Sequence, residues 1–164
     1  MTAYVQEDFV YDDELLMEDS LDTTAAVSAI AASQAGTLLE VAKVLDVGDG
    51  LVEGYMITDI DQIAVTTNVD DLYRIRLQGT NVAAFATSAD IHDLAILELG
   101  SGEMMFEGSG TATTSDTGAA GERYVTPFRN EQGGTLFRYL RVYTYQEGTA
   151  DTITHTTWLS IKRK

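Results

Sequence analysis

Histidines and paired aspartates are the side chains of this sequence best suited to acid–base or metal chemistry. His92 lies between Asp90 and Asp93, and a histidine beside a carboxylate can act as a base or bind a metal ion. Asp59 and Asp61 are two residues apart, so on a strand they would share a face and could bind Ca²⁺ or act as a glycosidase pair. These groups define one alternative function, a small hydrolase.

Other catalytic signals are absent from the sequence. The chain has two histidines and no cysteine, so it offers few zinc ligands and no disulfide. It contains neither the D-x-[DN]-x-[DN]-G calcium loop nor the G-x-S-x-G nucleophile elbow, and no glycine-rich phosphate loop. We therefore predict that the protein is not an enzyme and has no cofactor and no metal site.

An aromatic and arginine-rich segment near the C-terminus is typical of an interaction surface. Residues 135–161 predict two strands joined by a turn, which would form a hairpin. Counting by twos, one face of the first strand carries Leu136, Arg138, Leu140 and Val142, and the other carries Phe137, Tyr139, Arg141, Tyr143 and Tyr145. Aromatic rings mixed with guanidinium groups are enriched in protein interfaces. We predict a subunit or partner contact at Phe137, Tyr139, Arg141 and Tyr143, with Arg129 and Arg138 as further candidates.

The same aromatic face has two other interpretations. A second sheet or the N-terminal segment of the same chain could cover it. Alternatively, rings around Tyr143, Tyr145 and Trp158 could stack on sugars, as they do in carbohydrate-binding β-sandwich modules. We favour a contact between subunits over internal cover.

Strand signals follow one another closely through the rest of the chain, at 38–48, 54–65, 72–81, 91–102 and 123–130. In residues 72–81, Tyr73, Ile75 and Leu77 alternate with polar residues, which is the pattern of a half-buried strand. Pro127 favours an edge position or a bulge for the strand that contains it. Residues 23–36 fit either a short helix or a strand.

These segments give six to eight short strands and no long helical pattern. Close spacing favours antiparallel pairing, so we predict an all-β fold: an antiparallel β-sandwich or jelly roll. Residues 23–164 would form this single domain.

The N-terminal segment is strongly acidic. Eight of the first 22 residues are Asp or Glu, with Phe9 and Tyr11 among them. This composition predicts an arm over residues 1–22 that orders on a partner, with Phe9 and Tyr11 as contact residues. The alternative is a short helix over residues 7–19 that packs on its own domain.

Charge is distributed unevenly along the chain, whose net charge is −16. Residues 1–122 hold 23 acidic and three basic residues, whereas residues 123–164 hold three acidic and seven basic ones. Nucleic-acid binding requires a basic surface, so we predict none. The basic third is suited to dock on an acidic protein surface or on the chain's own acidic start. No segment approaches the ~20 apolar residues of a membrane helix, so we expect a soluble protein made in a cytoplasm.

Several segments resemble the capsid cement or decoration proteins of tailed phages, of the Bordetella-phage type. The similar stretches are YRIRLQGTNVAAF (73–85), DLAILELGSG (93–102), GERYVTPFRNEQGGTLFRYLRVYT (121–144) and EGTADTITHTTWLS (147–160), with LDVGDG (45–50) similar to a glycine turn of the family. Together they span about two-thirds of the chain. The acidic residues 1–22 look longer and more charged than the family's start.

This resemblance implies a β-sandwich or jelly-roll protein that sits on the outside of a phage head. It implies a homotrimer whose partners are its own copies and the major capsid protein, and which clamps neighbouring capsomers. The expected location is therefore the outer capsid surface of the virion, and the expected role needs no catalytic residue.

Overall fold

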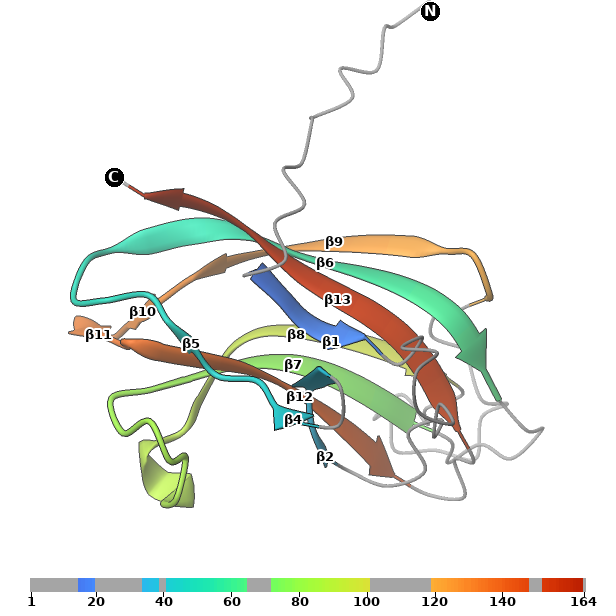
Figure 1. Cartoon of the computed structure of the whole chain (residues 1–164), viewed down its shortest axis with the longest axis horizontal. Coiled ribbons are helices and arrows are strands. Elements are labelled where there is room, and N and C mark those ends of the chain that lie inside the picture. Colours follow the sequence, from blue (N-terminus) through green and yellow to red (C-terminus); the bar gives the residue numbers. More distant parts are fainter. Residues whose placement is uncertain are drawn as a thin grey trace, which may run out of the picture.

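Two antiparallel sheets packed face to face make up most of the structure (Figure 1). The computed structural model describes residues 15–19, 34–38, 41–64, 72–100, 119–147 and 152–163. The first sheet has the strand order β1 (Leu16–Asp19), β13 (Ile153–Arg163), β6 (Val52–Ile63) and β9 (Arg123–Arg129). The second has the order β2 (Gln34–Ala35), β12 (Tyr139–Glu147), β7 (Leu72–Thr80) and β8 (His92–Gly100). The predicted all-β sandwich is confirmed.

Shorter elements complete the two layers. β5 (Leu45–Asp46) pairs with β12, and two small ribbons join β3 (Thr37–Leu38) to β4 (Val41–Ala42) and β10 (Glu131–Gln132) to β11 (Thr135–Leu136). A single turn of 3₁₀ helix spans Ser88–Asp90. The segment 38–48, predicted as one strand, is therefore divided into β3, β4 and β5. Pro127 lies in β9 at an edge of the first sheet, as predicted.

The core lies between the inner faces of the two sheets. In β7 the side chains of Tyr73, Ile75 and Leu77 are fully buried, as the alternating sequence predicts. Met56 from β6 and Leu159 from β13 belong to the same cluster, contributed by the opposite sheet. Burial of each such apolar side chain stabilises the fold by about 1.5–3 kcal/mol.

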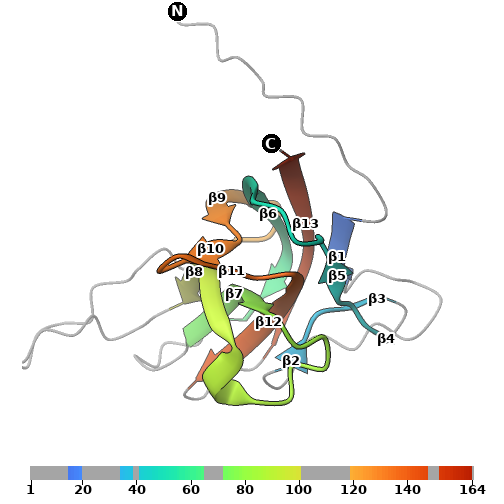
Figure 2. The same ribbon diagram turned by 90° about the vertical axis from the view of Figure 1, so that its left-hand side faces the viewer.

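The hairpin predicted over residues 135–161 is wrong. β12 pairs with β7 on one edge and with β2 and β5 on the other, while β13 pairs with β6 and β1. Because both edges of β12 are already paired, β13 crosses to the opposite sheet (Figure 2). A side-chain contact links the two strands across the core, with Thr144 Oγ1 and His155 Nε2 2.9 Å apart.

Part of the predicted N-terminal arm belongs to the sandwich. β1 pairs antiparallel with β13, and the side chain of Met17 is fully buried in the core. Residues 16–19 are thus a strand, and the alternative of a helix is wrong for them. Residues 1–14 and 20–22, which include the candidate contacts Phe9 and Tyr11, lie outside the described residues.

Candidate interaction surface

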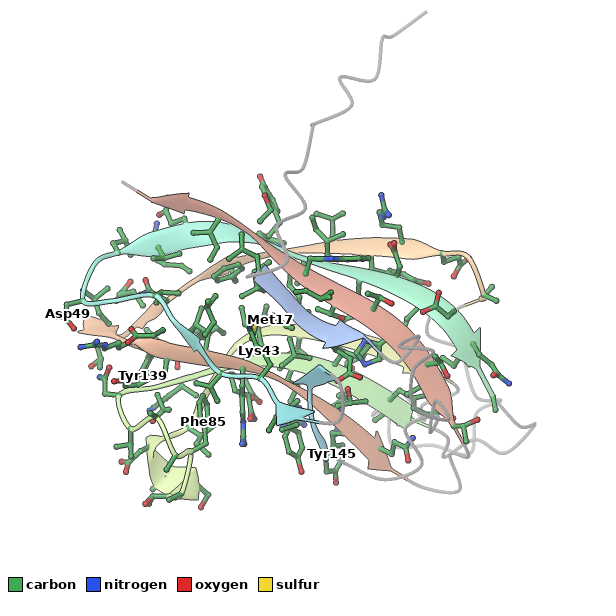
Figure 3. All side chains as sticks on the ribbon, viewed as in Figure 1. Met17, Lys43, Asp49, Phe85, Tyr139 and Tyr145 are labelled. Carbon is green, nitrogen blue, oxygen red and sulfur yellow. The ribbon has the colours of Figure 1, made fainter. Side chains whose placement is uncertain are left out.

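The outer face of the second sheet brings arginines and aromatic rings together. In the antiparallel register of β7 and β12, Arg74 lies opposite Tyr145, Arg76 opposite Tyr143 and Gln78 opposite Arg141. Each cross-strand pair places its side chains close together on one face. The arginine–aromatic face is defined here as Arg74, Arg76, Gln78, Phe85, Arg141, Tyr143 and Tyr145. Figure 3 labels Tyr145 on β12 and Phe85 in the loop between β7 and β8, both at this face.

Two of its arginines are neutralised by carboxylates of β8. Arg74 Nε donates to Glu98 Oε1 at 2.7 Å, and Arg76 Nη1 donates to Asp93 Oδ2 at 3.1 Å. The guanidinium carbons of both also lie over the ring of Tyr145, at 5.9 and 5.1 Å from its centre. These contacts fix the geometry of the face and leave little net charge at its β8 side.

Arg141 differs from these two arginines in its partners. Its guanidinium carbon lies 4.3 Å from the ring centre of Phe85 and 5.0 Å from that of Tyr143. Its Nε donates to Gln78 Oε1 at 3.0 Å. Among the described residues no carboxylate lies within ion-pair distance of Arg141, although every other arginine with a described side chain has such a carboxylate. Burial lowers the pKa of Arg141, since desolvation disfavours its charged form.

Phe85 reaches Arg141 from the loop between β7 and β8. Its backbone has φ +48°, the one positive φ among the described residues other than glycine. A left-handed conformation costs a residue with a Cβ about 1–2 kcal/mol. The backbone N–H of Phe85 donates to the Val82 carbonyl at 2.9 Å, and its side chain is only 9 % exposed. The loop thus holds an unfavourable backbone conformation that places the ring against the guanidinium.

Tyr139 and Arg138 lie at the start of β12, near β5. Arg138 Nε and Nη2 both donate to the carboxylate of Asp46, each at 2.8 Å, and the guanidinium carbon lies 5.4 Å from the ring centre of Tyr139. Hydrogen bonds from Arg138 and from the Gly48 N–H hold the pKa of Asp46 below its usual value, and the bond to Asp46 raises the pKa of Arg138. The donors of Arg138 are therefore engaged within the chain.

Phe137 does not belong to the exposed face, so the predicted contact at this residue is wrong. Its side chain is only 3 % exposed and stacks on the ring of His92, with the ring centres 4.7 Å apart. Residues 137 and 138 precede β12 and are not part of a strand, so counting by twos from Tyr139 fails there. Asn130 fixes this turn by donating from Nδ2 to the Phe137 carbonyl at 2.9 Å.

Arg129 lies on the other sheet, in β9, and does not join the arginine–aromatic face. It pairs with Glu53 at 2.6 Å and with Glu131 at 3.7 Å. These residues also line a groove of about 520 Å³ between β8 and β9, together with Tyr55 and Phe128. The groove mixes apolar surface with carboxylates that are already paired.

The structure separates the residues of the alternative functions. Tyr143 and Tyr145 lie on β12 and Trp158 lies on β13 in the opposite sheet, so the predicted row of rings for a sugar is wrong. His92 lies on β8, whereas Asp59 lies on β6 and accepts from Arg123 Nη2 at 2.6 Å. Within the described ranges, His, Cys, Asp and Glu do not form a group of three that could hold a metal ion.

The part of the chain that the structure describes contains no helix with the length and hydropathy to span a membrane.

The residue pattern of the sequence predicts Arg141 and Tyr143 as contact residues but gives no sign of Phe85. Phe85 sits among small residues, NVAAF, in a segment with no strand or helix pattern. Its contact with Arg141 joins residues far apart in the sequence, so no local signal could have found it. Arg76 and Gln78 were recognised only as the polar side of a strand.

No family model matches this chain, and no curated protein sequence matches it.

Proposed function

We propose that the protein is a decoration protein of a tailed-phage head, which binds as a homotrimer to the outer capsid surface and stabilises contacts between capsomers of the major capsid protein. The resemblance of residues 45–50, 73–85, 93–102, 121–144 and 147–160 to such proteins supports this proposal, and the β-sandwich fold agrees with it. The proposed role requires a binding surface and no catalytic residue.

The observation that carries the proposal is the arginine–aromatic face, above all Arg141 held against Phe85 and Tyr143 without a carboxylate of its own among the described residues. Arginine and tyrosine are the residue types that most often dominate the binding energy of interfaces. A guanidinium already held by stacking loses little further entropy when it binds. The face is therefore preorganised for a protein partner.

Binding of this kind stabilises a shell by mass action. A ligand that binds only the assembled form contributes RT ln(1 + [L]/Kd), which is about 2.7 kcal/mol at a hundredfold excess over Kd. The term applies at every occupied site, so a protein present in many copies reinforces the whole shell. The net charge of −16 also keeps the decoration protein from competing for DNA.

The test is co-sedimentation of the purified protein with heads of the encoding phage that lack it. Arg141→Gln should weaken binding by about 30-fold, the effect of losing a contact worth 2 kcal/mol. Arg123→Gln is the matched control, because Arg123 is an exposed arginine on the opposite sheet. It should bind like the unaltered protein.

Two measurements, urea unfolding and binding to the heads, decide the outcome. Urea unfolding should show that both variants are fully folded under the conditions of the binding assay, which separates loss of the contact from loss of the fold. Equal binding of Arg141→Gln and the unaltered protein to the heads would contradict the proposed role of this face.

A further inference from the structure

One edge of the Arg141 guanidinium, formed by Nη1 and Nη2, makes no hydrogen bond with the described residues. Its guanidinium carbon lies over the rings of Phe85 and Tyr143, and its Nε donates to Gln78. None of the described residues accepts a hydrogen bond from the terminal nitrogens Nη1 and Nη2. The side chain is nevertheless half-buried, so its charge is only partly hydrated.

A carboxylate is the group that best fits this edge. Two parallel N–H groups of arginine match the two oxygens of a carboxylate, and such forked pairs are roughly twice as strong as neutral hydrogen bonds. Partial desolvation strengthens the attraction further. The edge therefore suits an Asp or Glu side chain, and the partly exposed ring of Tyr143 favours an occupant with aromatic neighbours.

The chain itself contains a segment of this composition. Residues 7–14, EDFVYDDE, hold five carboxylates and two aromatic rings, and the first basic residue of the sequence is Lys43. This segment directly precedes residue 15, where the described part of the chain begins. Its carboxylates and its rings complement the Arg141 site, which is the Nη1 and Nη2 edge of Arg141 together with the partly exposed ring of Tyr143.

The position of β1 indicates which copy supplies the segment. β1 is an edge strand of the first sheet, paired with β13, and it begins at Leu16. Arg141 lies on the outer face of the second sheet, the face on which Figure 3 shows Tyr145. The described chain therefore begins at an edge of the sheet opposite the Arg141 site, which favours a neighbouring molecule over the same one as the source of the segment.

We propose that residues 7–14 of one copy dock on the Arg141 site of a second copy, with a carboxylate of the segment accepting from Nη1 and Nη2 of Arg141. This contact joins two copies of the chain and does not depend on a capsid. It assigns the acidic segment and the arginine–aromatic face to the same interface.

Sedimentation velocity of the full chain over a range of concentrations tests the proposal. One variant, Arg141→Gln, removes the site, and a second, Asp12→Asn with Asp13→Asn and Glu14→Gln, neutralises the segment. Each variant alone should associate about 10- to 100-fold more weakly than the unaltered protein, as expected for loss of a charge-assisted contact. Added salt should weaken association of the unaltered protein as well.

Mixing the two variants is the decisive experiment. The Arg141→Gln chain keeps an intact segment and the neutralised chain keeps an intact site, so a 1:1 mixture should recover association that neither shows alone. Arg123→Gln, an exposed arginine of the other sheet, should associate normally and serves as the matched control.

Three results would overturn the inference. The first is that either variant associates as strongly as the unaltered protein, and the second is that the unaltered protein is strictly monomeric. The third is that the mixture of variants stays dissociated, which would place the segment on its own copy. If Arg141→Gln lost binding to phage heads but kept normal self-association, this inference would fail while the proposed function stood.

Discussion

His155 makes a specific pH dependence of stability predictable from the structure. Its side chain is fully buried in β13, with Nε2 2.9 Å from Thr144 Oγ1 and Nδ1 2.9 Å from Thr157 Oγ1. Burial lowers the pKa of His155 to about 3, from the ordinary value of 6.5. The folded protein therefore keeps this imidazole neutral through the whole range between those two values.

The direction of the effect follows from proton uptake. As the pH falls below about 6.5, the imidazole of the unfolded chain gains a proton, while that of the folded chain does not until about pH 3. Acid thus stabilises the unfolded state, and the free energy of unfolding decreases as the pH is lowered. Between pH 7 and pH 5 this one group removes about 2 kcal/mol of stability.

Urea unfolding at pH 7 and pH 5, followed by the fluorescence of Trp158, measures this loss. The unaltered protein should lose about 2 kcal/mol more between the two pH values than His155→Gln does, at one fixed protein concentration. Carboxylates titrate in both proteins and cancel in the difference. His92→Gln is the control, because it removes the other histidine and leaves His155 in place. An equal loss in the unaltered protein and in His155→Gln would refute the reasoning.

Two further substitutions test the packing of the sandwich by urea unfolding. Gly54→Ala would place a Cβ 1.9 Å from the backbone oxygen of Ser160 in β13, so it should destabilise the fold by about 3 kcal/mol or more. The control is Gly50→Ala, whose added Cβ meets no atom within 4 Å, so it should change the free energy of unfolding by less than about 0.5 kcal/mol. Equal effects of the two would contradict the close approach of β6 and β13. Asn130→Ala removes a fully buried side chain that accepts from the Val52 N–H at 2.7 Å and donates to the carbonyls of Gly50 and Phe137, so it should lower the free energy of unfolding by about 2–3 kcal/mol. A loss below about 1 kcal/mol would show that these bonds are not made.

Much of the fold could be predicted because strand periodicity is a local property. The alternation of Tyr73, Ile75 and Leu77 with polar residues depends only on which face of one strand meets the core. The edge position of Pro127 follows equally from the missing backbone N–H of proline.

Pairing between strands could not be predicted in the same way. Two strands adjacent in the sequence usually pair, but β12 and β13 lie in opposite sheets because both edges of β12 are taken by strands from earlier in the chain. β1 was missed for a related reason. The acidic residues around Met17 indicate a solvated segment, whereas its pairing with β13 is visible only in the structure.

The residues of the arginine–aromatic face also divide into those that strand pattern predicts and those that only the structure places. Arg141 and Tyr143 share one face of one strand, so the sequence alone could place them together. Phe137 was misplaced because it lies outside the strand, and Phe85 was missed because a loop with a left-handed residue brings it to Arg141. The alternating residue pattern thus identified β12, the strand that carries Arg141 and Tyr143, but not Phe85, which contacts Arg141 from a loop.

Hydroxyl-radical footprinting of the protein, free at a concentration low enough to keep it monomeric and then bound to phage heads, tests the proposed role of the arginine–aromatic face most directly. Tyr143 and Tyr145 on the second sheet should lose reactivity on binding, while Tyr55 and Tyr124 on the first sheet keep theirs. Protection of Tyr55 and Tyr124 with unchanged oxidation of Tyr143 and Tyr145 would contradict it.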